Sequence, residues 1–522
     1  MTTAIAPYRS ELPVGRDGFA QLLRAEFTKF RTVRAWVIAL GAVAVLVVAF
    51  AWVGSHQGSG TCTEGPSGAP ACTTSSVPSA VVGPGGGPVV DTFSFLHQPL
   101  VASGSVTAKV SSISELVASG NGSNHPGLAP WAKAGILMAE NTTQGSAYAA
   151  VMVTPSHGVR MQYNYTTDTA GLPGPVSASS PRWLRLTRAG DLVTGYDSLD
   201  GAHWAKIGTV HLTGLTGSVQ AGLFVTSAAY DLGANNSSAT LATATFGQVH
   251  MSGDFPHHSW DNQVEGANTQ TYPTQRSGPS WFRQSGGTFT ISGSGDIAPQ
   301  VAGGNLGGSG GTTSLLASGA FGLIAVTVLA TLFITSEYRR GLIRTTLTAS
   351  PRRGRALAAK ALVIGSVTFV AASIATAIAE AVSRHVLYAN GNYVFPLSTP
   401  SEVRAVLGTG LLFAIAAVLV LALGTILRPS AGAVATGIVV FVLPFIVSHP
   451  LSPAASGWLF RVTPTAAFAV QGTLPHFAQV SNAYTMQNGY YPLGPWAGLA
   501  VLGAYAAVAF GAAVWLVRRR DV

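Results

Sequence analysis

Hydrophobic residues occur in two patterns along the chain: long apolar runs near both ends and short alternating stretches between them. A helix needs roughly twenty apolar residues to cross about 30 Å of membrane hydrocarbon. Six runs approach that length: Ala35–Val53, Leu315–Thr335, Leu357–Val382, Ala405–Leu427, Ala431–Ser448 and Trp496–Val517. We therefore expect six transmembrane helices.

An amphipathic pattern precedes the first of these runs. Apolar residues recur at helical spacing, with basic residues between them, at Phe19, Leu22, Leu23, Phe27, Phe30 and Val33. This predicts a helix over residues 19–34 that lies in the membrane interface, its basic side chains facing anionic headgroups. Residues 1–18 have mixed polarity and include two prolines, which predicts a disordered arm. The first transmembrane helix then covers residues 35–53.

The segment between the first and second apolar runs shows the alternation of β-strands. Apolar and polar residues alternate in short stretches such as Val106–Val110 and Ala134–Met138, separated by turn sequences such as Asp200-Gly201. We expect an all-β sandwich over residues 89–300, inserted between transmembrane helices 1 and 2. Residues 54–88 and 301–314 are rich in small and flexible residues, which predicts linkers.

The charge content supports a membrane protein. Only 9% of the 522 residues are charged, whereas about a quarter are charged in a typical soluble domain. The net charge of +9 comes from basic residues beside the apolar runs, so membrane topology explains it better than a nucleic-acid partner does. We therefore expect the lipid bilayer, and no nucleic acid, as a partner.

The distribution of basic residues predicts the orientation of the chain in the membrane. Arginines and lysines precede the first run, lie between the second and third runs, and follow the last run at Arg518–Arg520. Basic residues near apolar runs face the cytoplasm. We therefore expect a multi-pass plasma-membrane protein with both termini in the cytoplasm and the sandwich outside.

The two cysteines, Cys62 and Cys72, both fall in the predicted outer linker. A disulfide is the economical interpretation, because the outer compartment is oxidising and a closed loop would order the linker. Two free thiols are the alternative. The pair has no additional Cys or His partners, so no metal site is expected.

The predicted sandwich resembles a known fold in three segments. Residues Trp131–Met138, Tyr148–Pro155 and Arg182–Trp204 are similar to the concanavalin-A-like, laminin-G-like sandwich. The resemblance implies glycan or protein binding, for which Trp131, Trp183 and Trp204 are stacking candidates, although such residues also fill sandwich cores. Acidic residues are scattered rather than paired, so we do not expect a glycoside hydrolase.

The connection between the second and third apolar runs combines helical spacing with many arginines. Its apolar face is formed by Leu342, Ile343, Thr346 and Leu347, and its arginines Arg339, Arg340 and Arg344 project elsewhere. Pro351 ends the pattern because proline lacks an amide donor. A short amphipathic helix over residues 337–350 is one interpretation, and a basic loop that only orients the flanking helices is the other.

This connection also carries a family resemblance. Glu337-Tyr338-Arg339, the segment Gly341–Leu347, and Pro351-Arg352-Arg353 are similar to the coupling-helix region of actinobacterial type-2 ABC transporter permeases. The resemblance implies an exporter permease, working as a homodimer or with a related permease. A separate cytoplasmic ATPase would bind ATP and Mg²⁺. Its docking site on this chain would comprise Glu337, Arg340, Leu342, Ile343, Arg344 and Leu347.

The chain has no GxxxxGK[ST] phosphate-binding loop, so we expect no enzyme activity and no cofactor in this polypeptide. The rival hypothesis is a membrane-anchored receptor that binds a glycan or protein without transport. A receptor would need only one or two membrane helices to display the sandwich. A secondary transporter is a third alternative, but the sequence shows no symmetry between halves.

Overall fold

The computed structural model describes most of the chain in fourteen ranges. These are residues 18–56, 61–64, 70–73, 80–118, 124–233, 236–256, 259–266, 281–301, 312–339, 341, 352–390, 392–473, 475–480 and 483–519.

Long helices form one part of the molecule. In the described ranges, six helices are long and apolar enough to cross a membrane: α2 (Arg34–His56), α5 (Thr312–Arg339), α7 (Arg353–Ala389), α8 (Thr399–Leu427), α9 (Ser430–Ser448) and α11 (Pro495–Arg519). Within α5, the candidate membrane span is Gly319–Tyr338. The expectation of six such helices is confirmed. Most extend beyond their apolar runs, because helical hydrogen bonding continues into polar sequence.

Shorter helices complete this part. α1 (Phe19–Thr32) precedes α2, and a break at Val33 separates the two. α10 (Pro453–Val462), the 3₁₀ helix η2 (Pro464–Gln471) and the single 3₁₀ turn η3 (Met486–Asn488) lie between α9 and α11. α5 continues through Arg339, so Glu337 belongs to α5 itself rather than to a separate helix beginning at residue 337.

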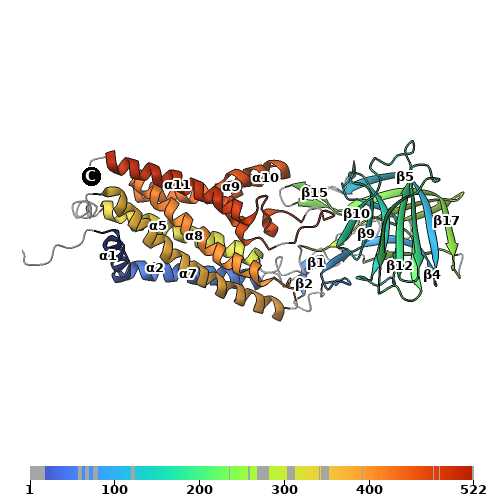
Figure 1. Cartoon of the computed structure of the whole chain (residues 1–522), viewed down its shortest axis with the longest axis horizontal. Coiled ribbons are helices and arrows are strands. Elements are labelled where there is room, and N and C mark those ends of the chain that lie inside the picture. The colour runs from blue at the N-terminus through green and yellow to red at the C-terminus, as the bar shows by residue number, and fades with distance from the viewer. Residues whose placement is uncertain are drawn as a thin grey trace, which may run out of the picture.

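Small residues let the central helix α8 approach its neighbours closely. A Cβ on Gly410 would overlap Ser373 of α7, and one on Gly424 would lie 2.8 Å from Ile334 of α5. Small residues at such crossings are typical of membrane helices, whose packing depends on close contact rather than on water exclusion. α8 therefore forms the core against which α5, α7 and α11 pack (Figure 1).

The described strands between α2 and α5 form two large antiparallel sheets. The seven-stranded sheet has the order β10-β9-β8-β7-β14-β4-β18, and the eight-stranded sheet has β13-β12-β11-β5-β17-β20-β19 with β6 beside β5. Their bounds are β4 Phe93–Leu100, β5 Gly104–Ala118, β6 Asn124–Gly127, β7 Lys133–Ala139, β8 Tyr148–Thr154, β9 Gly158–Tyr163, β10 Thr167–Ala170, β11 Arg182–Ala189, β12 Leu192–Ser198, β13 Ala205–His211, β14 Val219–Thr226, β17 Thr240–Gly253, β18 Asp261–Glu265, β19 Phe282–Ser285 and β20 Thr288–Gly293.

The two sheets share one apolar core. Leu184 and Leu186 of β11 alternate with partly exposed residues and pack in the same cluster as Ile136 and Met138 of β7. β7 and β8 are buried on both faces, because a second apolar cluster including Leu137 covers the other side. Apart from Lys133 and Thr154 at their ends, their sequences therefore lack the alternation of polar residues.

Three further strand pairs are small. β3 (Val89–Asp91) pairs with β21 (Ile297–Pro299), so the two ends of the β domain meet. β15 (Tyr230–Gly233) pairs with β16 (Asn236–Ser238). β1 (Thr61–Glu64) pairs with β2 (Pro70–Thr73) inside the predicted linker, and this ladder places Cys62 directly opposite Cys72. The backbone register brings the cysteines together, and their disulfide stays a prediction.

Candidate functional site

A buried cluster of charged residues joins three helices at the end of the helical part that is far from the β domain. Lys360 of α7 is 1% exposed. Its Nζ lies 2.7 Å from Glu26 Oε1 of α1 and 2.7 Å from Glu337 Oε1 of α5. Lys29 of α1 also pairs with Glu337. Two acids and two bases therefore balance one another in a site with little access to water.

The sequence of α1 explains how the cluster forms. Glu26 and Phe30 are four positions apart, so they share one face of the helix and are its buried residues. Phe30 packs against Phe333 of α5, with ring centroids 6.2 Å apart, and Lys360 Nζ lies 5.9 Å from the same ring centroid. Aromatic rings therefore exclude water around the charges, and buried charges are stable only when paired.

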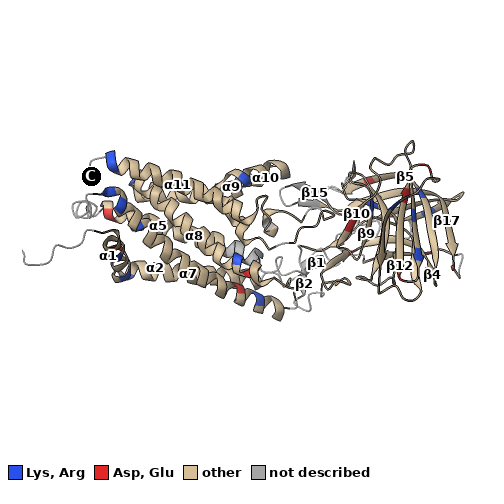
Figure 2. Cartoon of the chain, in the orientation of Figure 1, with Lys and Arg blue, Asp and Glu red and all other residues tan. Residues whose placement is uncertain are grey.

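The position of this cluster along the chain connects it to the predicted coupling segment. Glu337 precedes residues 342–350 and Lys360 follows them, so both sides of that segment are held to α1 through one lysine. Figure 2 shows basic residues gathered at this end of the helices, near α1 and the C-terminal end of α11. Within the described ranges, the ion cluster is therefore the contact between α1 and the flanks of the segment.

Glu337 is the one predicted docking residue whose side chain the structure describes. The Glu337 side chain is 1% exposed and pairs with two lysines of its own chain. Its carboxylate is therefore engaged within the chain, and its role in docking an ATPase stays a prediction. The remaining five predicted residues lie outside the described side chains: Arg340, Leu342, Ile343, Arg344 and Leu347.

Sequence reasoning did not identify Glu26 and Lys360 as partners, although each carries a signal. Glu26 is an acid beside the apolar positions of an amphipathic helix, and Lys360 is the one basic residue inside the apolar run Leu357–Val382. An isolated charge within an apolar segment requires a partner. The identity of the partner was not readable, because the two residues are 334 positions apart.

At the other end of the helical part, η2 interrupts the path between α10 and α11. All its residues are buried. Gln471 Nε2 donates to Thr409 Oγ1 of α8 at 3.0 Å, and Arg404 donates to the Gly472 carbonyl at 2.6 Å. Non-α-helical backbone at membrane depth is tolerated where protein buries it. The 3₁₀ helix η2 is thus fixed to α8.

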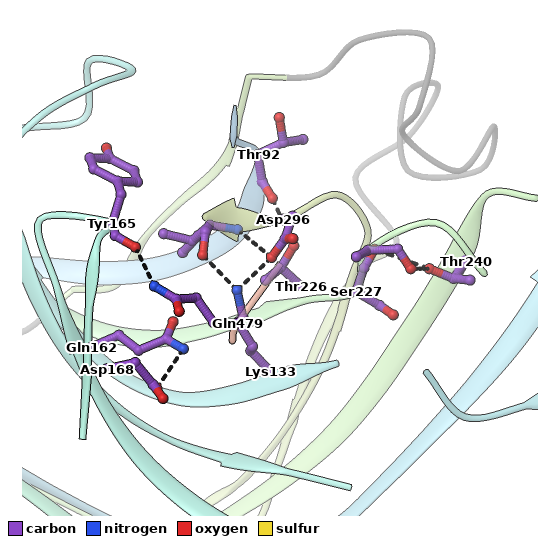
Figure 3. A network of polar contacts seen from close by, with 12 residues as sticks. Thr92, Lys133, Gln162, Tyr165, Asp168, Thr226, Ser227, Thr240, Asp296 and Gln479 are labelled. Carbon is purple, nitrogen blue, oxygen red and sulfur yellow. Dashed lines mark hydrogen bonds and ion pairs between the residues drawn. The ribbon is translucent and has the colours of Figure 1, made fainter. Parts of the chain in front are cut away.

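The chain just beyond η2 holds the β domain. Gln479, which is 2% exposed, donates from Nε2 to the carbonyls of Tyr165 at 2.9 Å and Thr166 at 3.1 Å (Figure 3). Tyr393 donates its hydroxyl to the Gly86 carbonyl at 2.9 Å. The β domain is therefore docked on two connections of the helical part, in addition to being tethered by its linkers.

A polar network surrounds this contact within the β domain (Figure 3). Lys133 of β7 donates to Asp296 Oδ1 and to the Ile297 carbonyl, both at 2.5 Å, which fixes β21 to the sheet. Tyr165 donates its hydroxyl to Asp91 Oδ2 of β3 at 2.7 Å. The strands that lead back toward the membrane are thus attached at the same place that receives Gln479.

Two carboxyl groups in this region have raised pKa values. Burial raises the pKa of Asp91 to about 6, despite hydrogen bonds from Tyr165 and Gly145 that lower it. Burial, with a smaller contribution from the nearby Asp91 charge, raises the pKa of Glu265 to about 7. Both groups therefore hold protons at pH values where exposed carboxyl groups are ionised.

The three tryptophans proposed for ligand stacking do not form one site. Trp131 is 5% exposed and its ring stacks on the His157 ring, with centroids 3.8 Å apart, which matches the alternative of a core role. Trp183 and Trp204 are half-buried at the outer face of the eight-stranded sheet. The guanidinium carbon of Arg185 lies 3.8 Å from the centroid of the Trp204 ring. The arginine therefore covers one face of that ring.

Metal-binding geometry is not seen in the described residues, where no group of three or more His, Cys, Asp or Glu side chains converges. The described part of the chain therefore offers no candidate metal centre.

Comparisons with known proteins give distant similarity only. No protein-family model matches the chain, and no curated protein matches it. A functionally unknown protein from Saccharomyces cerevisiae is 11% identical, with a TM-score of 0.21 over 30% of this chain and 74% of that protein. Scytalido-glutamic peptidase is 10% identical, with a TM-score of 0.25 over 40% of this chain and 100% of the peptidase. The GH43 protein BlXynB from Bacillus licheniformis is 13% identical, with a TM-score of 0.19 over 30% of this chain and 28% of that protein. Similarity at this level carries no functional argument.

Proposed function

We propose that this chain is the membrane-spanning permease subunit of a type-2 ABC exporter, driven by a separate cytoplasmic ATPase. The observation that carries the proposal is the ion cluster of Lys360, Glu26 and Glu337. It fastens α1, α5 and α7 together on both sides of the segment predicted to dock the ATPase. A receptor has no evident use for such a junction.

The cluster supplies a physical route for coupling. A force on residues 342–350 would act on α5 through Glu337 and on α7 through Lys360. Because buried ion pairs are costly to separate, the three helices would move together rather than slide apart. Nucleotide-driven closure of the ATPase dimer would then rock this unit against the rest of the bundle, as in other rigid-body transitions.

The opposite end of the helices supports the same proposal. η2 is buried against α8 through Gln471, and the chain continues from there to Gln479, which donates to the Tyr165 carbonyl of the β domain. A rocking motion of the helices would therefore reach the β domain through a short connection. We place this domain outside the cell as an accessory module for a glycan or protein ligand, with Trp183 and Trp204 as its remaining stacking candidates.

Co-purification tests the proposal. The full chain should purify from its native membrane with an ATPase subunit, and Leu347→Asp should abolish that association by placing a charge on the apolar docking face. Thr348→Asp is the matched control, since helical spacing places it toward Arg344 instead. Equal ATPase recovery with Leu347→Asp and the unsubstituted chain would contradict docking through this segment. Absence of any ATPase would favour the receptor hypothesis.

A further inference from the structure

An open groove of about 900 Å³ runs along the outside of the helical part where α1, α2 and α7 meet. Its lining comprises Leu23, Arg24, Phe27, Leu40, Leu362, Val363, Ser366, Val367, Val370, Ala371 and Ile374. About half of the surface of Phe27, Leu362, Val370 and Ile374 is exposed. The groove therefore opens sideways, toward the lipid that surrounds membrane helices.

The length of the groove corresponds to one leaflet of a bilayer. Leu362 and Ile374 lie twelve positions apart on α7, which is about 18 Å at 1.5 Å per residue. Half of the ~30 Å hydrocarbon layer is about 15 Å. The Lys360–Glu26 ion pair fixes α1 next to the Leu362 end. The groove thus begins at the interfacial helix and ends near the middle of the membrane.

The polar groups of the groove lie at one end. Ser366 donates its hydroxyl to the Leu362 carbonyl at 2.7 Å, so it has no hydrogen-bond donor left for an anionic ligand. Arg24 is exposed at the α1 end, and no carboxylate among the groove-lining residues faces it. The nearby acid Glu26 is engaged by Lys360. An apolar channel with a cation at its interfacial end matches a molecule with an acyl chain and an anionic headgroup.

We propose that this groove binds an anionic membrane phospholipid, with one acyl chain along α7 and the headgroup phosphate at Arg24. A second copy of the chain fits less well, because it would have to bury Arg24 against a compensating acid. Bound lipid would also hold α1 against α7, next to the ion cluster. The site stands independently of the proposed transport function, since it rests on the shape and charge of the groove alone.

Native mass spectrometry of the purified full chain tests the site. The detergent solution would contain equal amounts of phosphatidylglycerol and phosphatidylcholine, and the retained ratio would be measured. The unsubstituted chain should favour phosphatidylglycerol. Arg24→Gln should reduce that preference about fivefold, the effect of one basic residue at a membrane surface. Arg31→Gln, an exposed cation of α1 outside the groove, should leave the preference unchanged.

A second pair of variants tests the apolar part of the groove. Val370→Trp would fill it and should reduce retention of both lipids. Val508→Trp on α11 replaces a residue that is 75% exposed and lies outside the groove, so it should have no such effect. Unchanged retention in both Arg24→Gln and Val370→Trp would overturn the proposal. Efficient cross-linking between Val370→Cys residues of two copies would also overturn it, by showing that a second chain covers the groove.

Discussion

Replacement of Lys360 by methionine is the sharpest test of the buried ion cluster. Methionine has a similar length and removes only the charge. Lys29 could still pair with Glu337, but Glu26 would lose its only ion-pair partner in the described structure. Glu26 is 5% exposed, so its carboxylate would remain in an environment that water does not reach.

The magnitude follows from the burial of each partner. Removing one partner of a buried ion pair costs about 3–5 kcal/mol, because the other charge is left uncompensated. We expect Lys360→Met to lower the free energy of unfolding by about that amount. Lys29→Met should lower the free energy of unfolding by ~1 kcal/mol or less, because the Lys29 side chain is 32% exposed. Glu337 would also retain its ion pair with Lys360. The triple variant Glu26→Gln, Glu337→Gln, Lys360→Met should recover most of the stability lost in Lys360→Met, because it leaves no buried carboxylate without a partner.

Denaturation in mixed micelles, followed by the helical circular dichroism signal, measures the free energy of unfolding of each variant and so ranks the variants. A double-mutant cycle between Glu26→Gln and Lys360→Met isolates the pair and should give a coupling energy of about 1–3 kcal/mol. If Lys360→Met cost no more than Lys29→Met, the cluster would not be the buried junction described above. Additive effects in the cycle would refute the direct pairing of Glu26 with Lys360.

Three further predictions concern the β domain and the orientation of the chain. Gln479→Ala should weaken domain docking, giving faster proteolysis in residues 74–88, whereas the exposed control Gln248→Ala should not. Because the pKa values of Asp91 and Glu265 are raised, the folded β domain holds protons that the unfolded chain releases. Its stability should fall as the pH rises from about 4, near the ordinary pKa of these groups, to about 8. Asp91→Asn should reduce the change in the free energy of unfolding over this pH range by about 2–3 kcal/mol. Thermal unfolding at several pH values measures this change. A cysteine at position 200 should be labelled from outside the cell and one at position 345 only from inside, and the reverse pattern would refute the topology.

The helical part was the most predictable feature of the fold. Membrane thickness fixes the length of an apolar run, so six runs such as Ala405–Leu427 predicted the six long apolar helices found in the described ranges. The sheet-rich part was predicted from alternation, although the interiors of β7 and β8 are apolar because both of their faces are covered. The small β1–β2 pair was missed, since its glycine- and threonine-rich sequence resembles a linker.

The candidate site was predicted only in part. The arginine-rich segment stays a predicted docking site, and the structure adds that Glu337 at its start lies inside the bundle. For Trp131 the sequence left ligand stacking and a core role open, and the structure shows a buried side chain stacked on His157. Side-chain orientation depends on which helices or sheets cover a residue. No local pattern around Glu337 or Trp131 contains that information.

The sequence by itself determined the length and apolarity of the helices, the β character of the inserted segment and the clustering of basic residues. Each of these follows from local composition and spacing. Only the tertiary structure decided that Glu26 meets Lys360 across 334 positions, and that Gln479 meets the backbone of Tyr165. Such contacts depend on how whole helices and sheets pack. A buried charge or amide in the sequence indicates that a hydrogen-bonding or ion-pair partner is needed, but it does not indicate which residue that partner is.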